Sequence, residues 1–307
     1  MKGVILDANS LGEIDLTPIV SSLDNWDVYG TTKPEDVALR ITHADVVLSN
    51  KVFLSERVLC SAENLKLISI MATGVNNVDL HATKKLNIKV CNAIAYATPS
   101  VAQHTINLML SLSTNLLEYL LDTRAGMWQK SDVFCRLDRP IIEMSGKKLG
   151  IIGYGELGKS VAKIARAFGM EILLSREMPL PLLLASVDYL SLHCPLTEDN
   201  AYMINKQTLA LMKPSAFLIN TARGGLVNST DLIEALEKGI INGAAIDVLE
   251  IEPAAENEVL LAANHLKNLL ITPHNAWGAV ESRNRLVVQM RENIDAFLAG
   301  EPIRLVM

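Results

Sequence analysis

Arg223, Glu252 and His274 stand just beyond three successive apolar runs that are typical of strands. Because parallel strands end at one edge of a sheet, we expect these side chains to share a crevice. Arginine can bind a carboxylate, histidine can give or take a proton, and glutamate can keep a histidine charged. Each residue taken alone is more often a turn or surface residue. All three at consecutive strand ends favour the reduction of a 2-keto acid.

A glycine-rich segment upstream, Gly153-Tyr-Gly155-Glu-Leu-Gly158, follows an apolar run and precedes an amphipathic stretch. This order of strand, GxGxxG and helix is typical of dinucleotide binding. The first glycine allows a tight turn, the second lets the backbone approach the pyrophosphate, and the third allows close packing of helix on strand. The N–H groups at the helix start then face the phosphates. The alternative is a ligand-free turn, and the complete setting favours a dinucleotide.

The next strand ends in Ser175-Arg176, where an NAD site usually carries an acidic residue for the ribose. A guanidinium suits the 2′-phosphate of NADP, because it forms charge-assisted hydrogen bonds. The alternative, that Arg176 is a solvated surface residue without a role in binding, is equally well supported by the sequence. The sequence therefore leans towards NADP and leaves NAD open.

Two series of alternating strands and helices position these residues, which predicts βαβ units and parallel sheets. The first series has expected strands at 4–7, 46–49, 67–72 and 89–91, with helices at 34–43, 55–64 and 79–86. The second has expected strands at 148–152, 171–174, 189–192, 216–220, 244–248 and 269–272, with helices at 155–168, 206–212 and 229–238.

Between the two series, Thr98-Pro99 can start a helix, and helical spacing of apolar residues continues to about residue 121. The stretch 122–143 has weak periodicity and is expected to be an extended arm, and 280–298 a closing amphipathic helix. The predicted fold class is α/β, with two doubly wound parallel-sheet domains: a Rossmann nucleotide domain (99–282) and a flavodoxin-like substrate-binding domain (1–98 and 283–307).

The composition excludes several classes of protein. The 307 residues are 50% hydrophobic and carry a net charge of −6, with no basic face for nucleic acid. The four cysteines are far apart, with neither a CxxC pair nor a histidine at metal-ligand spacing, so we expect reduced thiols and no metal site. No export signal or membrane span is recognisable, so we expect a cytoplasmic protein without membrane contact.

The chain resembles the D-isomer-specific 2-hydroxyacid dehydrogenases. The resemblance runs almost end to end and rests on GYGELG from Gly153, NTARGGLV from Asn220, DVLEIEP from Asp247 and TPHNAW from Thr272. It implies that Arg223 binds and polarises the keto acid and that His274 is the general acid/base, with its pKa raised by the charge of Glu252. The resemblance, together with the glycine loop and Ser175-Arg176, assigns the dinucleotide contacts to Gly153, Gly155, Glu156, Leu157, Gly158, Ser175, Arg176, Thr221, Ala222, Asp247 and Ala276.

A turn in the first series, Thr73-Gly74-Val75, can form an anion-binding nest of N–H groups, although by sequence alone it is only a turn. The resemblance implies that it holds the substrate carboxylate. Within the family, glycerate dehydrogenases and hydroxypyruvate reductases are most similar to this chain in three segments: this turn, SVAQH from Ser100, and TPHNAW. We therefore expect hydroxypyruvate/glycerate or glyoxylate/glycolate as the substrate pair, and a homodimer formed partly through the arm.

One region departs from the family pattern. Between Ser175 and the strand near Tyr189 the family has a longer connection with a further short strand or turn and a helix, so either the adenosine side is trimmed or residues are missing here. The alternative function is an NAD(P)-binding, corepressor-like sensor with little turnover, but such relatives usually carry appended segments. A formate dehydrogenase-type enzyme would pair the histidine with a second histidine, and Glu252 argues against that.

Overall fold

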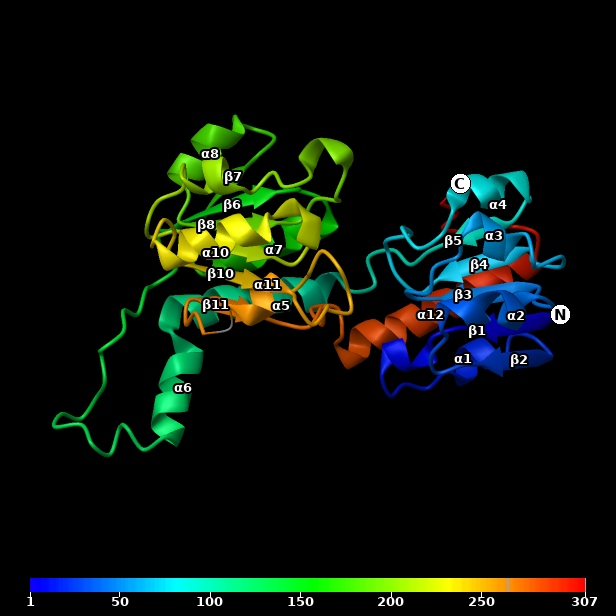
Figure 1. Cartoon of the computed structure of the whole chain (residues 1–307), viewed down its shortest axis with the longest axis horizontal. Helices are drawn as coiled ribbons and strands as arrows, with labels where there is room; N and C mark the ends of the chain where they lie inside the picture. Colours follow the sequence, from blue (N-terminus) through cyan, green and yellow to red (C-terminus); the bar gives the residue numbers. More distant parts are fainter. Residues whose placement is uncertain (264, 307) are drawn as a thin grey trace. The chain divides into compact units, whose positions relative to one another are not determined.

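The computed structural model describes residues 1–263 and 265–306, which form two compact units. Unit 1 comprises Met1–Ala97 and Gly278–Met307, and unit 2 comprises Thr98–Trp277. The second boundary of this division, 277/278, differs by five residues from the predicted 282/283. The predicted boundary would have cut through helix α12 (Val280–Leu298), which packs on β4 and α1 of unit 1 (Figure 1).

Unit 1 is a parallel sheet flanked by short helices. Its strands are β1 (Lys2–Ile5), β2 (Asn25–Val28), β3 (Val46–Ser49), β4 (Leu67–Ile70) and β5 (Lys89–Cys91). Besides α12, its helices are α1 (Thr17–Val20), α2 (Val37–Ile41), α3 (Glu56–Leu59) and α4 (Leu80–Lys85), with 3-10 turns at Ala8–Leu11 and Pro34–Asp36. The order β2-β1-β3-β4-β5 is the flavodoxin-like arrangement.

Unit 2 is a parallel sheet of six strands. They are β6 (Lys148–Ile152), β7 (Glu171–Leu174), β8 (Tyr189–Leu192), β9 (Phe217–Asn220), β10 (Gly243–Ile246) and β11 (Leu269–Ile271). The helices are α5 (Thr98–Thr114), α6 (Leu116–Arg124), α7 (Glu156–Ala167), α8 (Leu180–Ser186), α9 (Lys206–Leu209), α10 (Ser229–Glu237) and α11 (Val259–Ala262), with 3-10 turns at Glu198–Asn200 and Gly224–Leu226.

The strand order in unit 2 is β11-β10-β9-β8-β6-β7, the order of a Rossmann sheet with β7 at its edge. A complete Rossmann half would add one more strand beyond β7, but α8 leads directly to β8 across this fully described stretch. The predicted fold class, two doubly wound α/β domains, is confirmed. In the connection from Ser175 to Tyr189 the structure forms the single helix α8.

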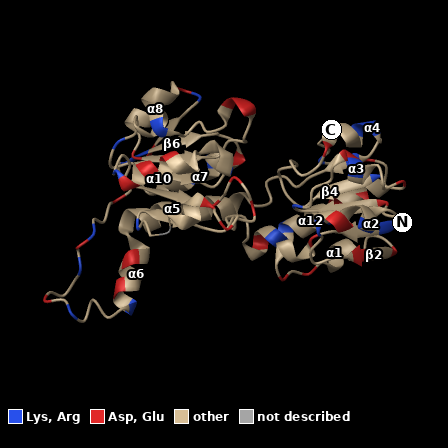
Figure 2. Cartoon of the chain, in the orientation of Figure 1, with Lys and Arg blue, Asp and Glu red and all other residues tan. Residues whose placement is uncertain are grey.

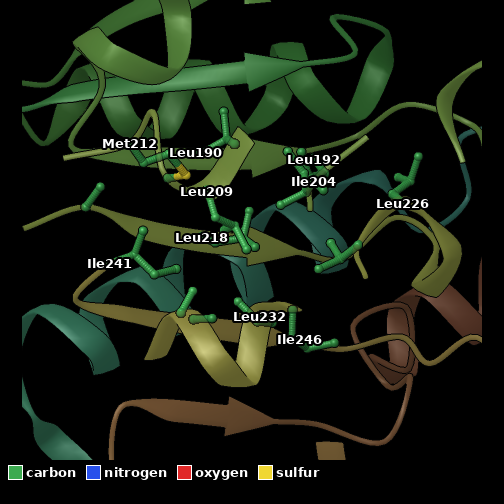
Figure 3. Packing of buried hydrophobic residues seen from close by; sticks show 14 of the residues in the cluster. Leu190, Leu192, Ile204, Leu209, Met212, Leu218, Leu226, Leu232, Ile241 and Ile246 are labelled. Atoms are coloured by element: carbon green, nitrogen blue, oxygen red, sulfur yellow. The ribbon is translucent and has the colours of Figure 1, made fainter. Parts of the chain in front are cut away.

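Both faces of this sheet are buried, which explains why its strands are almost continuously apolar. Leu190, Leu192, Leu218 and Ile246 pack on one face with residues from α8, α9, α10 and α11, and Figure 3 shows part of this cluster. Successive strand residues point to opposite faces. The alternate residues, among them Tyr189, therefore pack with α5 and α7 on the other face.

The predicted helix from about 100 to 121 is interrupted. Asn115 has a left-handed φ of 51° and separates α5 from α6, and its side chain donates to Pro140 O at 2.7 Å. Asparagine tolerates this conformation, which ends one helix and redirects the next. Residues 125–143 form no regular element and return to the domain, where Ile142 N donates to Ser113 O (Figure 1).

Charged residues of both signs are interspersed along both units (Figure 2). Within the described parts of the chain, every helix is too short or too polar to span a bilayer.

Candidate active site

The glycine loop lies where the strand order of unit 2 reverses. Gly153 follows β6 with φ +93°, and a Cβ there would come within 2.5 Å of Cys194 N, just beyond the neighbouring strand β8. The chain runs outward to β7 in one direction and to β9 in the other, so the crevice between β6 and β8 is the topological switch point. This is the position at which open α/β sheets bind ligands.

Helix α7 begins at this crevice, with Gly155 as its N-cap. The N–H groups of Glu156, Leu157 and Gly158 belong to the first turn, where no intrahelical acceptor is available. The space where a Cβ of Gly155 would point holds no atom of the described chain within 4 Å, whereas a Cβ on Gly158 would lie 2.2 Å from Gly153 O. The open space and free donors fit the pyrophosphate of a dinucleotide, and the third glycine allows helix and loop to touch.

Arg176 lies beside this loop. Its guanidinium carbon is 4.7 Å from the centroid of the Tyr154 ring, and its Nε is 3.7 Å from the Glu177 carboxylate. The side chain is 62% exposed, so its charge is available to a ligand. Ser175 precedes it in the turn and donates its N–H to Ile151 O.

His193 was not among the predicted site residues, although it follows β8 directly at the crevice. Its Nε2 is 2.9 Å from Ser191 Oγ, and its buried Nδ1 has no hydrogen-bond partner among the described residues. Burial lowers the pKa of His193 to about 4, so the imidazole is neutral at physiological pH. The rule that singled out His274, a polar residue directly after an apolar strand, would also have found His193.

His274 and Glu252 are in direct contact. The distance from His274 Nδ1 to Glu252 Oε2 is 2.5 Å, and Glu252 Oε1 accepts the N–H of Leu249 at 2.8 Å. The His274 and Glu252 side chains are 28% and 31% exposed, respectively. With Nδ1 engaged, Nε2 is the ring nitrogen that can exchange a proton with a bound molecule.

Arg223 follows β9 and reaches the same edge of the sheet. Its Nη1 donates to Ala222 O at 2.6 Å. A Cβ on Gly224 would lie 2.1 Å from the carbonyl carbon of Leu249, so the arginine loop packs against the segment that leads to Glu252. The structure therefore brings the loops of Arg223, Glu252 and His274 to one edge.

The residues expected near the nicotinamide are buried: Thr221, Ala222, Asp247 and Ala276 are each less than 10% exposed. The Asp247 carboxylate accepts hydrogen bonds from Thr272 Oγ1 at 2.5 Å and from the N–H groups of Asn275 and Ala276, both at 3.1 Å. Its side chain is thus occupied in holding the turn that carries His274.

The predicted substrate loop belongs to unit 1. Thr73, Gly74 and Val75 follow β4, and Thr73 O accepts the side-chain N–H of Asn92 at 2.7 Å. Thr73 is exposed, and Gly74 and Val75 are half-buried. The loop is therefore carried by a different unit from Arg223 and His274.

Comparisons with known proteins agree with this geometry. Residues 106–276 match the family model described as D-isomer specific 2-hydroxyacid dehydrogenase, NAD binding domain. A glycerate dehydrogenase of Methylorubrum extorquens is 42% identical over 282 residues, covering 90% of each chain. A hydroxypyruvate reductase of Blautia hydrogenotrophica is 35% identical, covering 100% of this chain and 99% of that one.

Among solved structures, D-lactate dehydrogenase from Aquifex aeolicus, complexed with NAD and lactic acid, has a TM-score of 0.84 at 28% identity and covers 97% of this chain and 96% of its own. The family match spans more than half of the chain, and the relatives align over nearly all of it. The chain therefore belongs to the D-isomer-specific 2-hydroxyacid dehydrogenases, a family of oxidoreductases that interconvert 2-hydroxy acids and 2-keto acids.

Proposed function

We propose that the protein reduces a small 2-keto acid, hydroxypyruvate or glyoxylate, to its 2-hydroxy acid and also catalyses the reverse reaction. The observation that carries this proposal is the 2.5 Å contact between His274 and Glu252 at the strand-end edge of the dinucleotide-binding sheet. The names of two relatives, glycerate dehydrogenase and hydroxypyruvate reductase, favour hydroxypyruvate.

The mechanism follows from the chemistry of three side chains. When bound, a nicotinamide dinucleotide supplies the hydride that reduces C2 of the keto acid. His274 donates the proton on Nε2 to the keto oxygen, and Glu252 stabilises the imidazolium through Nδ1. Arg223 pairs with the substrate carboxylate and polarises the keto group. In the oxidation direction, neutral His274 removes the hydroxyl proton.

We assign the dinucleotide to unit 2 and the second anchor of the substrate carboxylate, Thr73, Gly74 and Val75, to unit 1. The pyrophosphate fits beside Gly155 at the start of α7. Arg176, exposed and next to the glycine loop, supports a preference for NADP over NAD.

Two further assignments concern the whole protein. The arm exposes large apolar side chains, which supports a homodimer in which a second copy covers them.

The second assignment is a location in the cytoplasm. The four cysteines are free thiols, which suits the reducing conditions there.

The proposal is tested by measuring NADH and NADPH oxidation with hydroxypyruvate, glyoxylate, pyruvate and phenylpyruvate. We expect turnover with at least the first two. His274→Ala should lower kcat by at least about 100-fold and leave the Kd of the dinucleotide unchanged, because general acid catalysis contributes about 10²–10⁴-fold. His81→Ala, which alters an exposed histidine of unit 1, is the matched control.

The outcomes separate the two candidate functions. Dinucleotide binding with no turnover of any keto acid would favour the sensor, a function that the His274–Glu252 pair and the enzymatic relatives do not favour. Loss of dinucleotide binding in His274→Ala would remove His274 from the acid/base role.

A further inference from the structure

A polar cluster lies beneath the turn that carries His274, and the proposed mechanism does not use it. His104 enters this cluster from α5, Asp247 follows β10, and Thr272 follows β11. The Asp247 side chain is 1% exposed and that of His104 is 18% exposed. The segments meet here although about 140 to 170 residues separate His104 from the other two in the sequence.

The hydrogen bonds in this cluster have a definite direction. Thr272 Oγ1 donates to Asp247 Oδ1 at 2.5 Å, so the hydroxyl has used its only proton. His104 Nε2 lies 3.1 Å from the same hydroxyl oxygen and must therefore be the donor in that bond. The same Nε2 lies 3.5 Å from Asp247 Oδ1. His104 thus fixes Thr272 and Asp247 together.

Asp247 in turn holds the turn that bears the proposed acid/base. Its two carboxylate oxygens accept the N–H groups of Asn275 and Ala276, and its backbone carbonyl accepts the N–H of His274 at 2.8 Å. His274 itself has a left-handed φ of 49°, a conformation that side-chain-bearing residues keep only when their surroundings impose it. Asp247 therefore provides the bonds that impose it.

We infer that His104 is a positioning residue that acts on His274 through Thr272 and Asp247. This inference rests on the proposed role of His274. Without the Nε2 donor, the Thr272 hydroxyl can rotate and the Asp247 carboxylate loses one of its restraints, so the His274 turn is less well fixed. The hydrogen bonds of His104 lead to Thr272 and Asp247. The glycine loop that would hold the pyrophosphate joins β6 to α7 instead. We therefore expect the rate to fall much more than the affinity for the dinucleotide.

The experiment compares His104→Ala and His104→Gln with the wild type in the full-length protein. We expect His104→Ala to lower kcat by about 10- to 100-fold, since a displacement of about 1 Å can cost about 100-fold in rate. The Kd of NADPH, measured by its fluorescence, should change much less than kcat. Glutamine keeps an N–H donor near the position of Nε2, so His104→Gln should recover most of the lost rate. His81→Ala is again the control.

A second measurement does not depend on turnover. In NMR spectra with labelled histidine, the ring signals of His274 should broaden or shift in His104→Ala and return towards the wild-type positions in His104→Gln. A merely structural role would lower the melting temperature of both variants without this recovery.

Three results would overturn the inference: kcat of His104→Ala within twofold of wild type, unchanged His274 signals, or a loss of NADPH affinity as large as the loss of rate. If the wild type turns over no keto acid, the proposed function fails by itself, and the His274 signals still decide whether His104 positions the turn.

Discussion

At the scale of single residues, the sequence was informative where one rule applied, namely that polar side chains directly after buried parallel strands meet at one edge. Arg223, Glu252 and His274 were found in this way, and their loops do meet. His104 could not be found so, because its contacts depend on how α5 packs across the sheet. The left-handed φ of His274 could not be predicted either, since nothing in the local sequence requires it.

His193 gives a residue-scale prediction on pH. Its pKa is about 4 in the folded protein and about 6.5 in the unfolded chain, so between these values the unfolded state binds the additional proton. The free energy of unfolding should therefore fall as pH is lowered from 6.5 towards 4, by at most about 3 kcal/mol from this group. Thermal melts over this range should show a shallower pH dependence for His193→Gln, which keeps a partner for Ser191. Parallel pH curves for variant and wild type would contradict the assignment.

At the scale of elements, the predicted strands at 148–152, 171–174 and 189–192 coincide with β6, β7 and β8. Buried strands such as β6 and β8 leave uninterrupted apolar runs, and the edge strand β7 keeps a short apolar run although it is only partly buried. Strand β2 (Asn25–Val28) was missed, since it is polar, partly exposed and at a sheet edge. The helix break at Asn115 was also missed, because apolar periodicity continues through it while the backbone does not.

The position of β7 leads to a prediction about the cofactor. This edge strand ends at the turn with Arg176, whose guanidinium lies over Tyr154 in the glycine loop. If it binds the 2′-phosphate, Arg176→Ala should weaken NADPH binding by about tenfold, the lower end for charge-assisted hydrogen bonds because the site is exposed. NADH binding should not change. Arg166→Ala, an exposed arginine on α7, is the control, and equal losses for both cofactors would refute the assignment.

At the scale of the whole molecule, the division into two α/β units was predictable because strands and helices alternate in two separate series. That unit 1 is built from two separate stretches of the chain was also predictable, but the residue at which the second stretch begins was not. The boundary depends on the unit against which a helix packs. Helix α12 packs on α1 and β4, and the division at 277/278 places the whole helix in unit 1.

The last prediction concerns the predicted arm together with the whole of α6, a segment that runs from 116 to 143 and is called the arm from here on. It is internally braced, since Arg139 Nη1 lies 2.6 Å from Asp122 Oδ2 and the Tyr119 hydroxyl donates to Arg139 O at 2.8 Å. Yet Phe134 is 90% exposed and Leu137 is 73% exposed, and the arm carries further exposed apolar residues at Leu116, Leu117, Leu120, Leu121, Met127, Trp128, Val133 and Ile141. Clustered apolar exposure of this kind marks an interaction surface, and we expect a second copy of the chain to cover it.

Sedimentation or light scattering should therefore give a mass of twice the 33.5 kDa of one chain. Introducing Phe134→Asp together with Leu137→Asp should shift the protein to the monomer, because two carboxylates would have to be desolvated at the interface. Leu39→Asp is the matched control, since Leu39 is 79% exposed but lies on α2 of unit 1, whereas the arm belongs to unit 2. A monomeric wild type, or a double variant that stays dimeric, would show that the arm's apolar surface has another use.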